Sequence, residues 1–417
     1  MIRSVRNSWE LYRESTGHLG CGSSILSKRP RFEDREPAGI TRGKGCRVWD
    51  ADGNQYIDSC NALGAVTLCH AIPEINRAVR RQLRRGVVYG RPHPLEGEVA
   101  ALLSEVIPCA EKVRFFKTGA DAIAVCIKIA RHATGRKCIL QCGYNGWLNT
   151  PAPPRGTAPP GVASGNPRKG VPPETAGLHR SLPWGKIEEW RQVFAEQAGE
   201  TAAVVVACDY AETEAGAEFL PSLRDLTAED DVLMIMDEIV TGFRVALGGA
   251  QERFGVAPNM AAFGKNMANG MPISAYAGKG DLLDSCAELS ISTTFGGETL
   301  SLAAARAAMG IYRRQGVIGH LWETGKILWG QAAELLASRG VRVEIRGVPV
   351  CPKLLFRSQD EHEAFFRACV EQGLFLYHVP YVNFSHKPKD VRETLRRLER
   401  VAGSLAAANS KEVLSHA

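Results

Sequence analysis

The sequence lacks any apolar run long enough to cross a membrane. Its first fifteen residues, MIRSVRNSWELYRES, carry charges but no apolar core of a secretory signal. No run of Lys and Arg is longer than a few residues, so the formal net charge of +6 favours an ordinary surface over one that binds nucleic acid. We therefore expect neither a membrane nor a nucleic acid as a partner, and a cytoplasmic location.

The twelve cysteines contain no CxxC pair, which argues against a zinc site or a redox motif. Several of them, such as Cys126, Cys138 and Cys208, stand in apolar runs and are expected to be small buried hydrophobic residues in a reducing compartment. The histidines, among them His70 and His93, are scattered and show no metal-ligand spacing. The sequence therefore predicts no metal site.

The 417 residues, 45% of them hydrophobic, can bury a large core and suggest two or three domains. Residues 1–44 are polar, basic and interrupted by Gly and Pro, which predicts an arm with one short helix. Residues 45–59 alternate apolar and polar side chains around Asp52-Gly53, which is typical of a β-hairpin. We assign residues 1–60 to an N-terminal arm and hairpin.

Strands and helices then alternate. Residues 112–116 and 137–142 are expected to be strands, and residues 121–135, with apolar side chains at helical spacing, the helix between them. The continuous apolar runs 202–208 and 232–237 indicate strands of a parallel sheet that are buried on both faces. Residues 61–300 are therefore predicted to form a large α/β domain.

Two further regions differ from this pattern. Residues 148–185 are rich in Pro, Gly, Thr and Ala and predict a long loop, which in a compact domain is often functional. After about residue 300, long amphipathic helices dominate, with short strands expected at 341–345 and 350–356. We assign residues 301–417 to a smaller α+β C-terminal domain.

Two segments bear the residue types of a reactive site. The run 232–237 leads directly into two carboxylates, Asp237 and Glu238, at the strand end where α/β folds place ligand chemistry. Lys265 ends a second apolar run, where loss of water would lower the pKa of its amine and allow it to attack a carbonyl. Taken singly, each has a plain alternative: a helix cap or satisfied surface acid, and an exposed loop lysine.

Two other strand ends add possible ligand contacts. Thr118 and Gly119 stand between a strand and a helix, where backbone N–H groups favour a phosphate, although Thr118 could be only a helix cap. Tyr144 follows another strand and could stack on a planar ring, or simply be a half-buried tyrosine.

In this order and spacing, the segments resemble those of class III aminotransferases, and within them the glutamate-1-semialdehyde aminomutase branch. The resemblance runs from about residue 45 to about residue 400 and includes WDADGNQYID (49–58), LCHAIP (68–73), TGADA (118–122), GYNG (143–146), DEIVTGFR (237–244), GKNMANGMP (264–272) and STTFGGETLS (292–301). It implies the fold of type I pyridoxal-phosphate (PLP) transferases, in which helices enclose a mostly parallel seven-stranded sheet.

The resemblance also implies a role for individual positions. Lys265 matches the lysine that holds PLP as a Schiff base and moves the proton of the substrate, and Asp237 matches the acid paired with the pyridine nitrogen. Ile239 and Tyr144 match the residues on the two faces of the cofactor ring.

The phosphate contacts come from two places. Thr118, Gly119 and Ala120 match the turn that binds the phosphate, although the family usually has Ser-Gly-Thr there. Thr294 matches a threonine that reaches the phosphate from the neighbouring subunit, which implies a homodimer with shared active sites.

The N-terminal arm departs from the pattern. Where the aminomutase has an arginine for the substrate carboxylate, an ungapped match places Lys28, with Arg29 and Arg31 as neighbours, and a match shifted by a residue or two would place Arg29 there. A lysine is a poor replacement for a bidentate arginine. We therefore expect an aminotransferase acting on small-molecule amine and carbonyl substrates, with an intramolecular aminomutase as the alternative. A non-catalytic nucleotide-binding protein is disfavoured, because residues 118–122 match neither a Walker loop nor GxGxxG.

Overall fold

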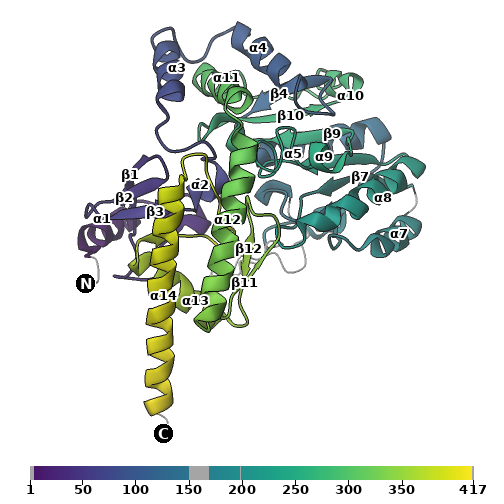
Figure 1. The fold of residues 1–417 in the computed structure, drawn as a ribbon. Helices are drawn as coiled ribbons and strands as arrows, with labels where there is room; N and C mark the ends of the chain where they lie inside the picture. The colour runs from purple at the N-terminus through teal and green to yellow at the C-terminus, as the bar shows by residue number, and fades with distance from the viewer. Residues whose placement is uncertain (1–3, 150–168, 198, 416–417) are drawn as a thin grey trace.

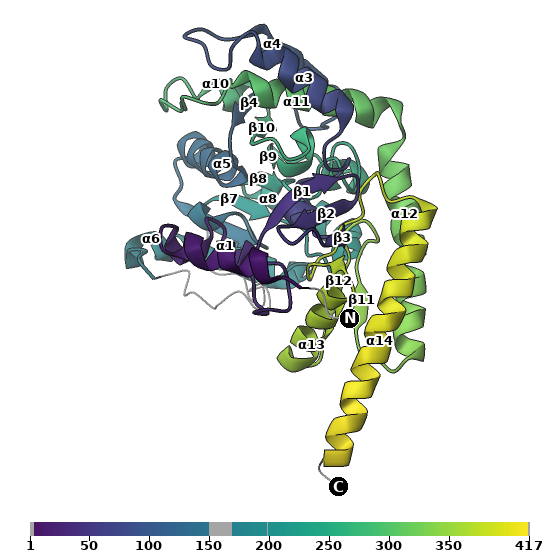
Figure 2. The same cartoon turned by 90° about the vertical axis from the view of Figure 1, so that its left-hand side faces the viewer.

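The computed structural model describes residues 4–149, 169–197 and 199–415. Its centre is a seven-stranded sheet with helices on both sides, and the N-terminal strands and the last two long helices lie along one flank (Figures 1 and 2). The last turns of α14 extend beyond the rest of the ribbon (Figure 1).

The central sheet is parallel except for one strand. Strand β10 is antiparallel to both of its neighbours, β4 and β9, and the remaining pairs are parallel. From one edge to the other, the strands are β4 (Lys112–Phe116), β10 (Ser274–Gly278), β9 (Met260–Phe263), β8 (Leu233–Asp237), β7 (Thr201–Val206), β5 (Cys138–Cys142) and β6 (His179–Ser181).

Alternate residues of these strands enter two different cores. Ala203, Val205 and Ile235 belong to the core beneath helix α5 (Gly119–Thr134). Their neighbours, such as Val204 and Met234, belong to the larger core on the other face, which includes residues of helices α8 (Gly216–Glu229), α11 (Thr299–Arg314) and α12 (Val317–Ser338). Burial on both faces explains why these strands have no polar alternation.

A second sheet joins the two ends of the chain. Strands β1, β2 and β3 are antiparallel, and β3 pairs in parallel with β13, a strand from the C-terminal part. Gly53, with φ +80°, forms the turn between β2 and β3. The bounds are β1 (Ile40–Lys44), β2 (Arg47–Asp50), β3 (Gln55–Asp58) and β13 (Leu374–Phe375).

The remaining elements are helices and one short hairpin, β11 (Glu344–Arg346) with β12 (Lys353–Leu355). The other α-helices are α1 (Arg6–Thr16), α2 (Asn61–Gly64), α3 (Pro73–Leu83), α4 (Pro94–Ser104), α6 (Pro173–Gly177), α7 (Ile187–Glu196), α9 (Ala250–Phe254), α10 (Gly280–Asp284), α13 (Gln359–Glu371) and α14 (Pro388–Ser415). Short 3-10 helices are η1 (Gly20–Gly22), η2 (Leu26–Lys28), η3 (Trp147–Asn149), η4 (Thr213–Ala215) and η5 (Lys265–Ala268).

The predicted arm helix, the hairpin and the strands of the α/β region are confirmed, with ends that move by one or two residues. The loop predicted for residues 148–185 is partly wrong. Residues 150–168 lie outside the described part, but residues 173–181 form helix α6 and strand β6. A three-residue strand is too short to show periodicity, and β6 forms only because β5 offers an open edge for pairing.

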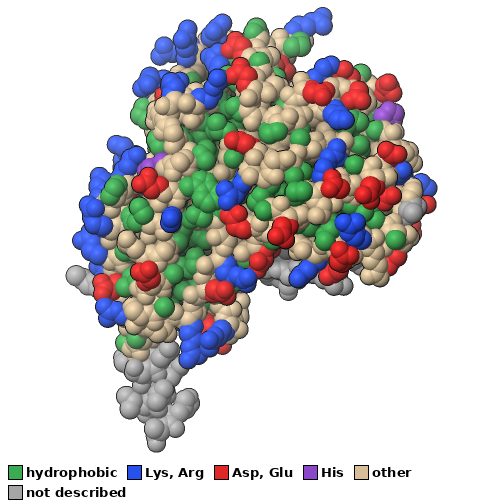
Figure 3. Space-filling model, turned by 45° about the vertical axis from the view of Figure 1, so that its right-hand side comes forward, with side chains coloured by type: hydrophobic (Ala, Val, Ile, Leu, Met, Phe, Trp, Pro, Cys, Tyr) green, Lys and Arg blue, Asp and Glu red, His purple; other side chains and the backbone are tan. Residues whose placement is uncertain are grey.

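On the face shown in Figure 3, basic and acidic side chains are interspersed. Within the described residues, no helix combines the length and the apolar character that a bilayer span requires.

Candidate active site

The predicted residues lie together at the carboxyl ends of the strands, which we call the site edge of the sheet. Because β4, β5, β8 and β9 point the same way, the residues that follow them emerge at the same edge. Asp237 is the last residue of β8, whereas Thr118, Tyr144 and Lys265 each stand two residues beyond a strand. Four segments that are distant in the sequence therefore meet at this edge.

The two neighbouring carboxylates have different environments. Glu238 is 1% exposed and accepts hydrogen bonds from the hydroxyl of Thr241 and from the backbone N–H groups of Ala250 and Gln251, so it caps helix α9. Asp237 keeps some contact with solvent, and its Oδ1 accepts the backbone N–H of Ile239 at 3.1 Å. The helix-cap alternative thus applies to Glu238, while Asp237 remains available for a ligand.

Opposing influences set the pKa of Asp237 just below neutral pH. Burial raises the pKa of this carboxyl to about 6. The N–H of Ile239, the charge of Lys265 and a hydrogen bond from the side chain of Asn145 act in the opposite direction and lower it. Asp237 is therefore mostly ionised at pH 7, and a cationic ligand beside it would strengthen that state.

Lys265 is held in an unusual backbone conformation. It begins η5 with φ +35°, in the left-handed region that side chains with a Cβ seldom adopt. Such strain persists only where surrounding contacts impose it, and it is concentrated at functional sites. Burial lowers the pKa of its amine to about 8, although Asp237 acts to raise it. A substantial fraction of the amine is therefore unprotonated near pH 8, unlike an exposed lysine.

Thr118 caps helix α5, as the plain alternative predicts. Its Oγ1 accepts the N–H of Asp121, and Asp121 in turn accepts the backbone N–H of Thr118. This arrangement still presents the N-terminus of a 16-residue helix at the site edge. Backbone N–H groups and the helix dipole favour an anion there. The Ser274 hydroxyl donates to the carbonyl of Thr118, at 2.7 Å, and anchors the turn to β10.

Ile239 lies between the predicted phosphate turn and the lysine loop. A Cβ on Gly119 would lie 2.6 Å from Ile239 Cδ1, and a Cβ on Gly264, which precedes Lys265, would lie 3.1 Å from the same atom. Because both glycines lack side chains, Ile239 packs directly against both backbones. The role on one face of the cofactor ring, which the resemblance implies for Ile239, stays a prediction.

Tyr144 is on the open side of the site. It exposes 62% of its surface, and the pKa of its phenol is raised by partial burial and by the charge of Asp237. Gly146, with φ +84°, brings this loop close to α5, because a Cβ there would lie 2.8 Å from the Cβ of Ala120. An exposed ring within reach of the Asp237 charge is available for stacking on a ligand.

Thr294 is not brought to this cluster within the chain. It is exposed, its neighbour Phe295 is 55% exposed, and its hydroxyl forms no hydrogen bond with the described residues. The segment is anchored at its end, where Lys117 pairs with Glu298 at 3.0 Å. Thr294 is therefore presented at the surface beside the strand that leads to the phosphate turn.

The basic residues of the arm differ in their contacts. Lys28, Arg29 and Arg31 are all exposed, but Arg31 also stacks on two rings, with its Cζ 5.2 Å from the centroid of Phe32 and 5.5 Å from that of Phe366. The sequence did not single out Arg31 as the carboxylate-binding cation. This stacked position distinguishes it from Lys28 and Arg29, for which no ring contact is found among the described residues.

Arg31 also has an electrostatic connection to the site through Tyr377. Burial raises the pKa of the Tyr377 phenol to about 12, the charge of Arg31 lowers it, and the nearby phenol of Tyr144 raises it again. Tyr377 therefore lies within range of both the arm and the residue predicted to stack on the cofactor ring. The arm thus approaches the same edge of the sheet.

Three more residues of the site had no predicted role. Asn145 bonds to Asp237, and Asn266, next to Lys265, donates to the carbonyls of Val240 and Gly242. Arg244 is buried beside them and donates to Asn266. All three stand within motifs that carry the family resemblance, but a polar residue in a motif does not reveal its partner. Only the fold decides that.

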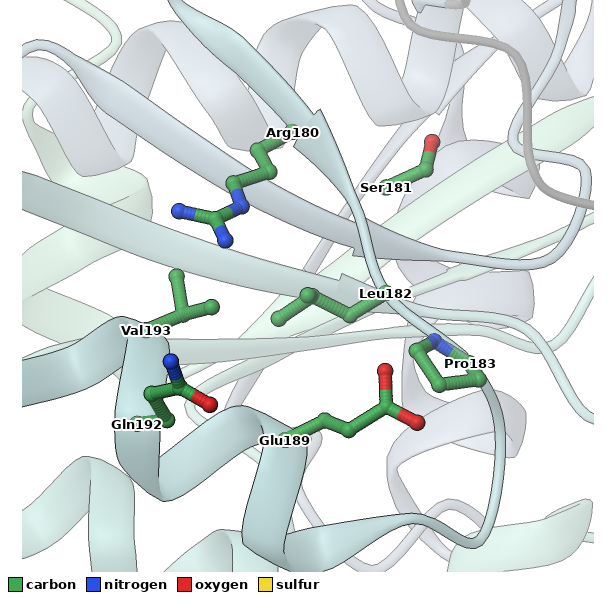
Figure 4. Close-up of a pocket in the computed structure, with 7 residues that line it drawn as sticks. All are labelled: Arg180, Ser181, Leu182, Pro183, Glu189, Gln192 and Val193. Carbon is green, nitrogen blue, oxygen red and sulfur yellow. The ribbon is translucent and has the colours of Figure 1, made fainter.

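A separate pocket lies beside β6, the outermost strand on one side of the sheet (Figure 4). It is lined by Arg180, Ser181, Leu182, Pro183, Glu189, Gln192 and Val193, from β6, the segment after it and α7. Strands β5 and β7 lie between β6 and β8 in the sheet, and this pocket contains none of the predicted site residues. Among the described residues, no group of His, Cys, Asp and Glu is arranged to hold a metal ion.

Solved structures share this fold. A transaminase with PLP bound superposes with a TM-score of 0.87 at 22% identity, covering 97% of this chain and 99% of the other. An omega-transaminase from Sphaerobacter thermophilus gives 0.82 at 24% identity, covering 95% and 97%. The fold is therefore that of the PLP-dependent enzymes of fold type I.

Sequence comparison defines the family. The Aminotransferase class-III family matches residues 30–385, and the chain belongs to this family. Proteins named glutamate-1-semialdehyde 2,1-aminomutase are similar over almost their whole length. The one from Aquifex aeolicus is 29% identical over 93% of this chain and 97% of its own, and the one from Persephonella marina is 30% identical over 95% and 98%. The chain is thus a PLP-dependent enzyme.

The described residues fit this cofactor. Asp237 and Lys265 carry opposite charges at the ends of adjacent strands, and their pKa values of about 6 and 8 leave both groups close to a change of charge. The bare backbone of Gly119 and the N-terminus of α5 provide an anion site a short distance along the same edge. An acid, an amine and an anion site are what a phosphorylated pyridine aldehyde requires.

Gly119→Ala is expected to weaken PLP binding by about tenfold or more, because overpacking of this kind costs about 1–3 kcal/mol. The new methyl group would displace Ile239, whose Cδ1 lies 2.6 Å from the Cβ position. The measurement is a titration of the cofactor-free enzyme with PLP. Gly177→Ala is the matched control, because no heavy atom lies within 4 Å of its Cβ position. Equal affinities for both variants would contradict the assigned contact.

Proposed function

We propose that this enzyme is an aminotransferase that moves an amino group between an amino donor and a carbonyl acceptor. Lys265 is the amine that attaches the cofactor and transfers the substrate proton, and Asp237 is the acid at the pyridine nitrogen. The observation that carries this proposal is that Lys265, with a pKa lowered to about 8, and Asp237, with a pKa raised to about 6, stand at adjacent strand ends within range of each other's charge.

Each site residue has a different role in the proposed reaction. Bound PLP supplies an electron sink for the substrate carbon. Asp237, whose side chain is oriented by Ile239 N–H and Asn145, would stabilise a positive charge on the ring nitrogen. Ile239 and Tyr144 would hold the ring in place from its two faces. The amine of Lys265 accepts and returns the proton, for which a pKa near the working pH is the most effective.

The test is a half-reaction. The purified holoenzyme is mixed with single amino donors, and conversion of the cofactor to its amine form is followed by absorbance. We expect conversion with at least one donor, followed by recovery when a carbonyl acceptor is added. A holoenzyme that is converted by no donor in a broad panel, although Lys265 carries the cofactor, would contradict amino-group transfer.

The similarity to proteins named as aminomutases supports a second candidate, an intramolecular amino shift within one substrate. Both reactions would use the same cofactor contacts. They differ in the need for a separate donor. Incubation with glutamate 1-semialdehyde, with and without glutamate, distinguishes them, because an aminomutase turns over without a donor.

The arm is where substrate binding should differ. Lys28 and Arg29 remain the candidates that the sequence predicts, and the stacked position of Arg31 over Phe366 makes it the third. Single alanine variants of the three, compared by KM for carboxylate substrates, would identify which cation is used. Loss of the cation that binds the carboxylate is expected to raise KM by about tenfold or more.

We further propose a homodimer in which Thr294 contacts the phosphate bound by the neighbouring subunit. The exposure of Thr294 and Phe295 supports this arrangement. Thr294→Ala and Lys265→Ala should each lower activity, and mixing the two variants should restore part of it. In a mixed dimer, the site with an intact Lys265 would receive Thr294 from the other subunit. No gain on mixing, with mixed dimers demonstrated by native mass spectrometry, would show that Thr294 acts within its own chain.

A further inference from the structure

Arg244 is a buried cation close to the lysine. It lies in the segment after β8 and is 0% exposed. A single nitrogen, Nη2, donates to the carbonyl of Gly64, to Thr67 Oγ1 and to Asn266 Oδ1, at 2.7, 2.7 and 2.8 Å. The guanidinium thus ties its own segment to residues 64–67 and to the loop that carries Lys265.

The charge of Arg244 has no anionic partner among the described residues. Its Nε and Nη1 are buried without a hydrogen-bond partner, and its Cζ lies 4.5 Å from the ring centroid of Tyr381. A buried cation is costly unless it is paired, and the molecule pairs many of its exposed arginines with carboxylates. An unpaired guanidinium in the interior therefore calls for a physical reason.

The ionisable groups around Arg244 cannot neutralise it. They come from other elements and are Tyr312 on α11, Tyr381, and Cys351 before β12. Burial raises the pKa of both phenols, and it raises the pKa of Cys351 to about 11. All three are neutral at the working pH, so the positive charge persists.

Asn266 connects Arg244 to the lysine. It directly follows Lys265, is 0% exposed, and uses both ends of its amide. Oδ1 accepts from Arg244 and from the Thr67 hydroxyl, while Nδ2 donates to the carbonyls of Val240 and Gly242. This network fixes Asn266. The strained backbone of Lys265, with φ +35°, is thereby held in place from the neighbouring residue.

We propose that Arg244 is a positioning residue for the proposed reaction: it holds Lys265 through Asn266, and its fixed buried charge disfavours a proton on the lysine amine. This inference rests on the role proposed for Lys265. Two charged groups act on that amine. Asp237 from β8 raises its pKa, whereas Arg244, after the larger effect of burial, lowers it. Removal of the Arg244 charge should therefore shift the balance toward the protonated amine.

The test compares full-length variants in two states. In the cofactor-free enzyme, the rate of Lys265 acetylation by acetic anhydride is measured against pH by peptide mass spectrometry, with the exposed Lys279 as internal reference. In the holoenzyme, the pH dependence of cofactor absorbance is recorded. The wild-type midpoint for acetylation is expected near 8. Arg244→Met should raise it by about one pH unit, which slows labelling at pH 7 by about tenfold.

Two other variants separate charge from packing. Arg244→Lys keeps the charge and should keep a midpoint close to that of the wild type. Arg253→Met is the matched control, because Arg253 also stacks on a ring, that of Trp322 at 4.3 Å, but pairs with Glu214 at the surface. It should leave both titrations unchanged.

The outcomes are distinct. A folded Arg244→Met variant with an unchanged midpoint would overturn the inference. Should that variant fail to fold, Arg244→Gln, which is also neutral but retains a donor for Gly64, carries the same comparison. If Lys265 of the wild type is acetylated with the same pH dependence as the exposed Lys279 and never carries the cofactor, the function proposed for Lys265 is itself contradicted. A normal wild type with unchanged variants refutes only the role of Arg244.

Discussion

Lys265→Ala is expected to lower the rate of amino-group transfer by about 10⁴-fold or more, because both the attachment of the cofactor and the proton transfer depend on one amine. The native amine is unusual in two respects: its pKa is lowered to about 8, and its backbone is strained at φ +35°. No other described residue on this edge offers an amine in such a setting. The measurement is the half-reaction with an amino donor under single-turnover conditions.

Lys279→Ala is the control for this variant, since Lys279 is an exposed lysine that follows β10. It should retain wild-type rates. Thermal unfolding of both proteins shows whether the fold is intact. A Lys265→Ala enzyme that transfers amino groups within tenfold of the wild type would exclude Lys265 as the reactive amine.

Asp237→Asn is expected to lower the same rate by about 10³-fold, because a neutral amide cannot hold a positive charge on the ring nitrogen. The substitution keeps the shape of the side chain and can still accept the N–H of Ile239. Folding should therefore survive while the electrostatic contribution is lost. Steady-state and single-turnover rates with one amino donor measure the effect.

The pH profile offers an independent check on Asp237. Burial raises the pKa of its carboxyl to about 6 in the enzyme without a ligand, so cofactor binding should weaken as the pH falls through this value and the carboxylate takes up a proton. In Asp237→Asn this acidic loss should disappear, because residue 237 no longer titrates. Glu238→Gln is not a matched test of charge, since Glu238 caps α9 and its loss should instead lower the melting temperature. An acidic limb that persists unchanged in Asp237→Asn would assign the titration to another group.

Much of the fold could be predicted from the pattern of apolar residues. The runs at 202–208 and 232–237 are continuous because β7 and β8 are buried on both faces, and a short run of this kind is typical of a strand inside a parallel sheet. The order of the strands could not be predicted in the same way. Nothing local in residues 274–278 shows that β10 inserts between β4 and β9 in the opposite direction. Likewise, β13 joins β3 across more than 300 residues, and the proposed limits at residues 60 and 300 stay a prediction.

By itself, the sequence determined the chemistry available to this enzyme. It showed an acid, Asp237, at the end of one buried strand and a lysine, Lys265, after another. It also showed a glycine, Gly119, at the start of a helix that follows a third strand. These features are local, because strand ends and helix caps depend on neighbours in the chain. Only the tertiary structure decided which groups meet. In the fold, Glu238 caps helix α9, whereas Asp237 does not, and the charge of Arg244 lies within range of Lys265. It also left Thr294 on the surface. Which charged side chains are paired, and how far each is removed from water, depends on contacts between distant segments. The pKa values of the site residues follow from these two factors.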